Sequence, residues 1–78
     1  MTSKNDTVRT QVQSSSLASV AYSASTATLE IEFQTGRLYR FFSVPRSIYD
    51  ELLAAESKGA YFNRMIRNQF PYTFVKKV

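Results

Sequence analysis

TLEIEFQTGRLYRFF, residues 28–42, is the stretch that decides the fold. In its first half Leu29, Ile31 and Phe33 alternate with polar or charged residues. This period of two is typical of a strand with one buried face and one polar face. A Gln-Thr-Gly turn follows, and residues 38–42 predict a second strand. The stretch therefore predicts an antiparallel hairpin.

Two registers of this hairpin are compatible with its turn. With a three-residue turn, Gly36 adopts the left-handed conformation and Glu30 faces Arg40 as an exposed pair, while Tyr39 and Phe41 point into the core. With a two-residue turn the register slips by one residue and every side chain changes face. Tyr39 and Phe41 then lie on the open face, and Arg40 points at the core. Because burying an unpaired arginine is costly, we favour the first register.

The N-terminal part carries weaker signals. Residues 1–11 are polar and turn-prone, so we expect a disordered lead-in, with residues 12–78 forming a single domain. Residues 12–22 have small side chains on alternate positions, which indicates a weak strand. Leu17 falls on the wrong parity, and a bulge or break near Ser16 is expected to bring it inward.

Two helices and a strand are predicted in the C-terminal part. Pro45 suits the first turn of a helix, Ser57 is a candidate N-cap of a second helix, and Pro71 is expected to end it. Residues 72–78 alternate as a last strand, with Tyr72, Phe74 and Lys76 on one face. The pattern predicts an α+β fold: a small antiparallel sheet of three to four strands with two short helices packed on one face.

The composition argues against several functional classes. The chain has no Cys and no His, so disulfides and the usual zinc, copper and haem ligand sets are absent, and we expect neither metal nor cofactor. Without His or Cys, no plausible base or activated nucleophile stands out, and we expect no enzyme. The longest apolar runs are far too short to span a membrane. The polar N-terminal residues do not form a secretory signal, so we expect a cytoplasmic protein.

The charge is unevenly distributed. The net charge is +4, and residues 36–78 hold eight Lys or Arg against three Asp or Glu, a net charge of +5. Aromatic residues are interleaved with these cations, a combination that binds RNA or another polyanion. The competing interpretation is that the rings form the core and the cations a solvated surface. The candidate nucleic-acid-binding residues are Arg37, Arg40, Arg64, Arg67, Lys76 and Lys77.

Two further functions are compatible with the sequence. Exposed sheet edges at residues 12–22 or 72–78 would pair with another chain, which predicts a protein-interaction or self-assembly module and a homo-oligomer. Sequestration of a nucleotide or small anion between protomers is the other alternative.

The apolar, turn and capping residues combine into the pattern Ser14-Ser15 … Tyr22 … Leu29-x-Ile31-x-Phe33-x-x-Gly36-x-x-Tyr39-x-Phe41-x-x-Val44-Pro45 … Tyr49-x-x-Leu52 … Ala55-x-Ser57-x-Gly59-x-Tyr61-Phe62-Asn63-x-x-Ile66. This pattern resembles the KTSC domain over about residues 12–74. The domain is a short module found at the C-terminus of some lysyl-tRNA synthetases and as a stand-alone bacterial or phage protein. The central Tyr-x-Tyr of the family stands here as Tyr39-Arg40-Phe41. The resemblance suggests RNA binding, through the synthetase context, and supplies no catalytic residue.

Overall fold

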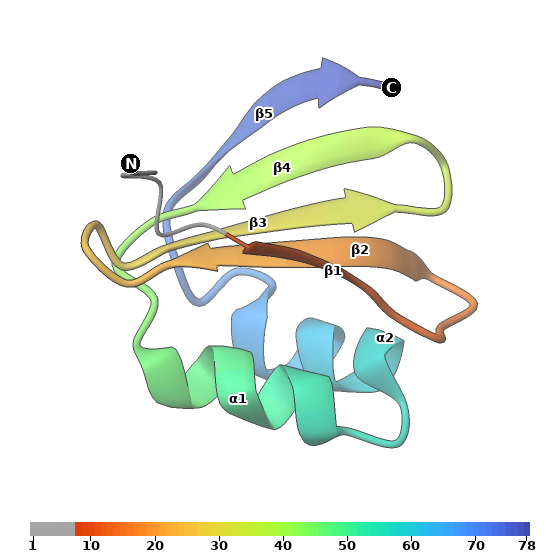
Figure 1. Cartoon of the computed structure of the whole chain (residues 1–78), viewed down its shortest axis with the longest axis horizontal. Coiled ribbons are helices and arrows are strands. Elements are labelled where there is room, and N and C mark those ends of the chain that lie inside the picture. The colour runs from red at the N-terminus through yellow and green to blue at the C-terminus, as the bar shows by residue number, and fades with distance from the viewer. Residues whose placement is uncertain (1–7) are drawn as a thin grey trace.

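Within residues 8–78, five antiparallel strands form one sheet, in which each strand pairs with the next along the chain. The computed structural model describes residues 8–78. Its strands are β1 (Val8–Gln11), β2 (Leu17–Ser23), β3 (Thr28–Phe33), β4 (Arg37–Phe41) and β5 (Tyr72–Lys77). All helices lie on one side of this sheet (Figure 1). The predicted α+β class and layer arrangement are confirmed, with five strands where three to four were predicted.

The additional strand is β1, and it corrects the predicted domain boundary. Residues 1–7 of the predicted disordered lead-in lie outside the described residues. Residues 8–11, by contrast, pair with β2, with Arg9 opposite Ala21 and Gln11 opposite Ser19. Three of the four side chains of this strand are polar, so the sequence gives only a weak strand signal here. Its support is backbone pairing together with the polar contacts of Arg9 described below.

The central hairpin has the register with the three-residue turn. Glu30 pairs with Arg40 and Ile31 with Tyr39. Gly36 has a φ of +92°, and its N–H donates to the Phe33 carbonyl oxygen at 2.8 Å. A positive φ is readily available only to glycine, so this residue fixes the turn and with it the faces of β3 and β4.

The weak strand predicted over residues 12–22 is shorter than expected. Residues 12–16 form a loop, and β2 begins at Leu17. Leu17 pairs with Phe33 and Ser19 with Glu32, so Ala18 is the extra residue of a bulge. As predicted, an irregularity brings Leu17 into the core, where it is fully buried, although the bulge lies at Ala18 and the break precedes Leu17.

The helical layer has three parts: α1 (Arg46–Ala54), α2 (Lys58–Tyr61) and the π-helix η1 (Phe62–Ile66). Helix α1 starts directly after Pro45, as predicted. The predicted cap of α2 is confirmed, because the Ser57 hydroxyl accepts from the Ala60 N–H at 3.2 Å. The helical turns end at Ile66, five residues before the predicted stop at Pro71. Asn68 then takes a φ of +64°, and the chain turns back toward the sheet.

The core lies between the sheet and the helices. Leu17, Val20, Leu29, Ile31, Val44, Leu52 and Ile66 are fully buried in it. Tyr22 joins the two layers: its hydroxyl donates to the Val44 carbonyl oxygen at 2.6 Å, and its ring stacks on Tyr49 at 5.2 Å between centroids. No helix within residues 8–78 is long and apolar enough to cross a membrane.

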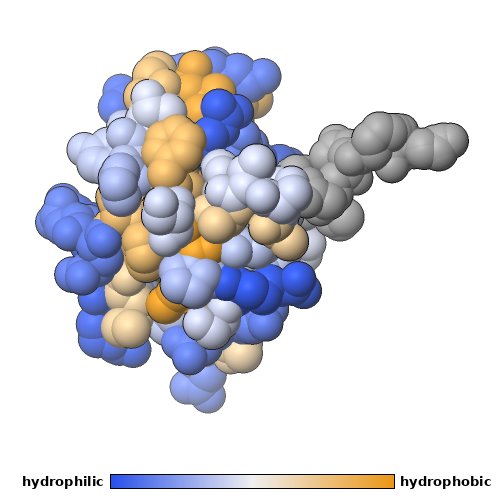
Figure 2. Space-filling model, turned by 90° about the vertical axis from the view of Figure 1, so that its left-hand side faces the viewer, coloured by the Kyte–Doolittle hydropathy of each residue, from blue (hydrophilic) through white to orange (hydrophobic). Residues whose placement is uncertain are grey.

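The helical layer leaves part of the sheet uncovered. Strand β5 lies at the far edge from α1 (Figure 1), and its rings remain exposed, Tyr72 by 57% and Phe74 by 51%. Figure 2 shows the end of the molecule at which β4 runs into α1. Apolar side chains form a broken band there, between the level of β5 and that of the helices, with hydrophilic groups on both flanks.

Candidate nucleic-acid interface

Two hollows adjoin on the helix-facing side of β4 and β5. The smaller has a volume of about 270 Å³ and is lined by Phe33, Tyr39, Phe41, Phe62, Arg67, Asn68 and Tyr72. The larger has a volume of about 710 Å³, and its lining includes Phe33, Arg37, Tyr39 and Lys77. Because Phe33 and Tyr39 line both, these two rings form the ridge between the hollows.

Tyr39 is the centre of the aromatic cluster. Its ring centroid lies 5.5 Å from that of Phe74, 5.8 Å from that of Tyr72 and 5.9 Å from that of Phe33. The contacts with Phe33 and Phe74 are edge-to-face, a favoured geometry for aromatic pairs. Together with three neighbouring cations, these rings form what we call the basic–aromatic face: Phe33, Arg37, Tyr39, Arg67, Tyr72, Phe74 and Lys77.

A bulge in β5 determines which of its residues belong to this face. Leu38 pairs with Lys76, but the next residue, Tyr39, pairs with Phe74, so Val75 is extra. Regular alternation would put Lys76 on the face of Tyr72 and Phe74, as the sequence predicted. The bulge exchanges the faces on which Lys76 and Lys77 lie. Lys77 joins the face, and Lys76 lies on the opposite side of the sheet.

The three cations of the basic–aromatic face have no acidic side chain paired with them in the described part of the chain. Arg37 and Lys77 are directly opposite each other on β4 and β5, and Arg67 follows η1. Among residues 8–78, none of the three makes an ion pair, and neither hollow is lined by a carboxylate. Like charges directly opposite in a sheet destabilise it, and a bound anion would offset this repulsion.

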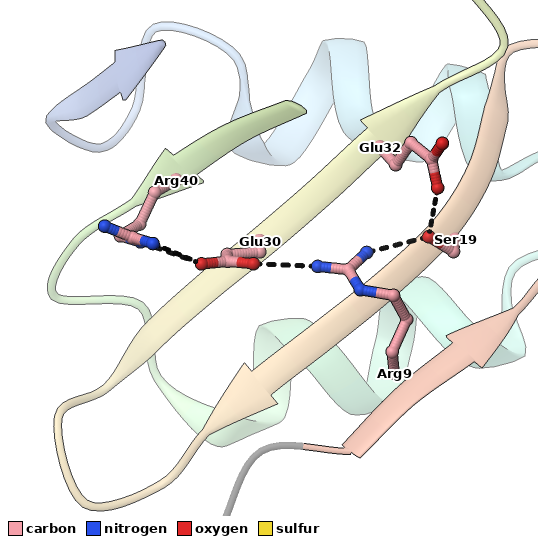
Figure 3. A network of polar contacts seen from close by, with 5 residues as sticks. All are labelled: Arg9, Ser19, Glu30, Glu32 and Arg40. Atoms are coloured by element: carbon pink, nitrogen blue, oxygen red, sulfur yellow. Dashed lines mark hydrogen bonds and ion pairs between the residues drawn. The ribbon is translucent and has the colours of Figure 1, made fainter. Parts of the chain in front are cut away.

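The other three candidate residues lie elsewhere. Arg40 is on the open face of the sheet, where it donates to Glu30 from both Nε (2.9 Å) and Nη2 (2.6 Å) (Figure 3). Lys76 shares that open face. Arg64 lines a separate hollow beside Glu51 and Tyr61. The six predicted residues thus divide into three that converge on the rings and three that do not.

The open face is held together by a chain of polar contacts (Figure 3). Arg9 donates to Glu30 Oε1 at 2.8 Å and to the Ser19 hydroxyl at 2.7 Å, and that hydroxyl donates to Glu32 Oε1 at 2.8 Å. Ser19 is fully buried, so its hydroxyl needs these partners. The network joins β1 to β4 and occupies both carboxylates within the sheet, which indicates a structural role.

Tyr61, which lies outside the basic–aromatic face, has a shifted pKa. The Tyr61 hydroxyl donates to Glu51 Oε1 at 2.6 Å. Burial, together with the hydrogen bond to this carboxylate, raises the pKa of Tyr61 to about 12. The phenol is therefore protonated at neutral pH, and it serves as a link between α1 and α2.

The exposure of Tyr72 and Phe74 could not be read from the sequence, because it depends on where the helical layer ends. The interleaved rings and cations of residues 72–77 were a usable signal. Asn68 was a second usable signal, for a turn after the helices, since asparagine is among the residues that tolerate a positive φ.

Comparison with known proteins places this fold in a family. The family model described as KTSC domain matches residues 13–70. A solved KTSC domain protein from Yersinia pestis has the same fold, with a TM-score of 0.87 and 28% identity, covering 90% of this chain and 99% of that one.

Two sequence relatives extend the comparison. An uncharacterized protein of Stutzerimonas stutzeri is 43% identical over 61 residues, which are 78% of this chain and 86% of that protein. A lysine–tRNA ligase of Nostoc sp. is 45% identical over 51 residues, which are 65% of this chain but only 9% of the ligase. Strand β5 lies outside residues 13–70, so three of the seven residues of the basic–aromatic face, Tyr72, Phe74 and Lys77, lie beyond the matched region. The extent of the family match and the shared fold show that this chain belongs to the KTSC domain family.

Proposed function

We propose that this domain is a non-catalytic binding module that holds RNA on its basic–aromatic face. The observation that supports the proposal is the pair Arg37 and Lys77, which are directly opposite each other and form no ion pair among residues 8–78. Arg67 adds a third cation on the other side of the ridge. Together they provide positive charge next to exposed rings.

RNA supplies negative charge for the cations of this surface and flat bases for its exposed rings. Its phosphates neutralise the facing cations and release counterions, which favours binding at low salt. Its bases stack on exposed aromatic side chains, an interaction available to every base. Tyr72 and Phe74 are exposed by more than half and are therefore accessible to a base.

The relatives favour RNA over other polyanions. The region shared with this chain occurs within lysine–tRNA ligases, enzymes whose name states that they act on a transfer RNA. The absence of His and Cys from the chain supports a binding role rather than catalysis, and we propose a cytoplasmic location together with the RNA ligand.

A direct titration tests the proposal. Fluorescently labelled single-stranded RNA and a transfer RNA are titrated with the protein, and anisotropy is measured at about 50 mM and about 200 mM salt. Three phosphate contacts predict a slope of about −2 in log K against log salt, a roughly twentyfold loss of affinity between the two conditions. Absence of binding at the lower salt concentration contradicts the proposal.

A second candidate function rests on the outer edge of β5. This strand is last in the sheet order, and no other strand of the described chain pairs with that edge. Tyr72, Phe74 and the terminal Val78 are all exposed beside it. Such an edge is a template for a strand of another molecule. Sedimentation velocity over a wide concentration range tests self-assembly, and a strictly monomeric protein contradicts that form of the function.

A further inference from the structure

The smaller hollow has the dimensions of a site for one flat ring. Its volume of about 270 Å³ lies just below the range of about 300–1,000 Å³ that is typical of small-molecule sites. Its walls include the rings of Tyr39, Phe41 and Tyr72, and those of Phe41 and Tyr72 are tilted by 35° with centroids 5.7 Å apart. A whole base pair does not fit a hollow of this volume, whereas a single heterocycle does.

Polar groups stand at the border of the same hollow. Arg67 and Asn68 both line it, and neither side chain makes a hydrogen bond or ion pair with another residue among 8–78. A guanidinium offers several donors, and an amide offers both donors and an acceptor. These are the groups that recognise the edge of an unpaired base. The hollow therefore combines aromatic walls for stacking with a polar border for hydrogen bonding.

The larger hollow begins across the ridge of Phe33 and Tyr39. There Arg37 and Lys77 provide two positive charges, with the hydroxyl of Ser15 and the amide of Gln34 also in the lining. A nucleic-acid strand that crosses the ridge meets an aromatic hollow on one side and a cationic hollow on the other. The base and the phosphate of a nucleic-acid strand match this order.

We infer that the basic–aromatic face takes single-stranded rather than duplex RNA. One unpaired base enters the smaller hollow, and a neighbouring phosphate is held between Arg37 and Lys77. The smallest ligand that fills both hollows is then two linked nucleotides. This inference rests on the proposed function and adds the state of the RNA that binds.

Duplex RNA does not satisfy the same contacts. Its bases are paired and stacked within the helix, so none reaches the smaller hollow without being extruded, which costs unstacking and unpairing energy. Only the cations then remain available to it, and these attract phosphates of any nucleic acid. The smaller hollow is thus the part of the basic–aromatic face that discriminates between single-stranded and duplex RNA.

The experiment compares one labelled RNA sequence as a single strand and annealed to its complement, at a fixed low salt concentration. We expect the single strand to bind at least about tenfold more tightly, since stacking of one base contributes about 5- to 150-fold in affinity. NMR of the complex should show intermolecular NOEs between base protons and the rings of Tyr39 and Tyr72.

Two matched variants complete the test. Tyr72→Leu removes a ring from the smaller hollow, and we expect single-strand affinity to fall roughly tenfold, to the level of the duplex. Phe42→Leu removes a ring that is also exposed, by 37%, but lies outside both hollows, and we expect no change. Circular dichroism checks that both variants fold.

The outcomes separate the inference from the proposed function. Equal affinity for single strand and duplex, or loss of affinity in Phe42→Leu as large as in Tyr72→Leu, overturns the inference while RNA binding stands. Binding of neither RNA overturns the proposed function and the inference with it.

Discussion

Tyr39 packs edge-to-face against Phe74 across the β4–β5 pair, with ring centroids 5.5 Å apart and ring planes at 69°. Tyr39 occupies a core-facing position of the hairpin and yet is only half-buried. The reason is that the helices stop short of β5, so that the core-facing side of the last two strands continues as an accessible aromatic surface.

This exposure predicts that Phe74 contributes little to folding. Phe74→Ala should lower the free energy of unfolding by about 1 kcal/mol or less, because half of its surface is already in contact with water. Leu29→Ala, in the fully buried core, should cost about 2–5 kcal/mol. Urea denaturation of the two variants measures both values. A loss for Phe74→Ala as large as that for Leu29→Ala would show that the aromatic face is part of the core.

The turn at Gly36 should tolerate no other residue well. Gly36→Ala should destabilise the protein by at least about 1–2 kcal/mol, because the φ of +92° is unfavourable for any residue with a Cβ. The added Cβ would also lie 3.0 Å from the backbone oxygen of Val78. Thr35→Ala, at the exposed neighbouring position, should change the free energy of unfolding by less than about 0.5 kcal/mol. Equal stability of the two variants in urea would contradict the assigned turn.

The open-face network predicts different contributions from two acidic residues. Glu30 contacts both Arg9 and Arg40, and its side chain is 22% exposed. Glu30→Gln should therefore lower the free energy of unfolding by about 1 kcal/mol or more. Asp50→Asn breaks the Arg46 pair, whose side chains are 64% and 59% exposed, and should change it by less than about 0.5 kcal/mol. Thermal or chemical unfolding of both variants at low salt measures the two losses. A loss for Asp50→Asn as large as that for Glu30→Gln would contradict this prediction.

Much of the fold could be predicted because local signals agreed. The alternation around Ile31, the glycine at position 36 and the cost of burying Arg40 led to the same hairpin register. The capping serine at position 57 and the proline at position 45 marked two helix starts. Strand β1 could not be predicted, because three of its four side chains are polar and its order depends on pairing with β2.

The candidate site was only partly predictable, and the reason is the bulge at Val75. A period of two assigns Lys76 to the face of Phe74, whereas the single extra residue puts Lys77 there instead. A bulge leaves no clear mark in the sequence. Similarly, nothing local to Arg40 shows that it is paired with Glu30 on the opposite side of the sheet from Arg37.

The link between α1 and α2 makes stability depend on pH in the alkaline range. The folded state holds the proton of Tyr61 up to about pH 12, whereas an unfolded tyrosine loses it near pH 10. The free energy of unfolding should therefore fall as the pH rises from 10 to 12.

Tyr61→Phe isolates this contribution from the other groups that titrate there. The variant is expected to be less stable at neutral pH, since the hydrogen bond to Glu51 is lost, and to depend less on pH between 10 and 12. Urea denaturation across this pH range gives both slopes. Parallel pH profiles for the two proteins would contradict the raised pKa.

The most direct test of the account compares two triple variants with the same charge. Arg37→Gln, Arg67→Gln and Lys77→Gln remove the cations of the basic–aromatic face, while Arg40→Gln, Arg64→Gln and Lys76→Gln remove the three that lie elsewhere. Each lowers the net charge from +4 to +1. The measurement is the salt dependence of single-stranded RNA affinity. We expect the first variant to lose about 2 units of slope in log K against log salt, and the second to retain most of its slope. Equal losses in the two variants would contradict RNA binding by the basic–aromatic face.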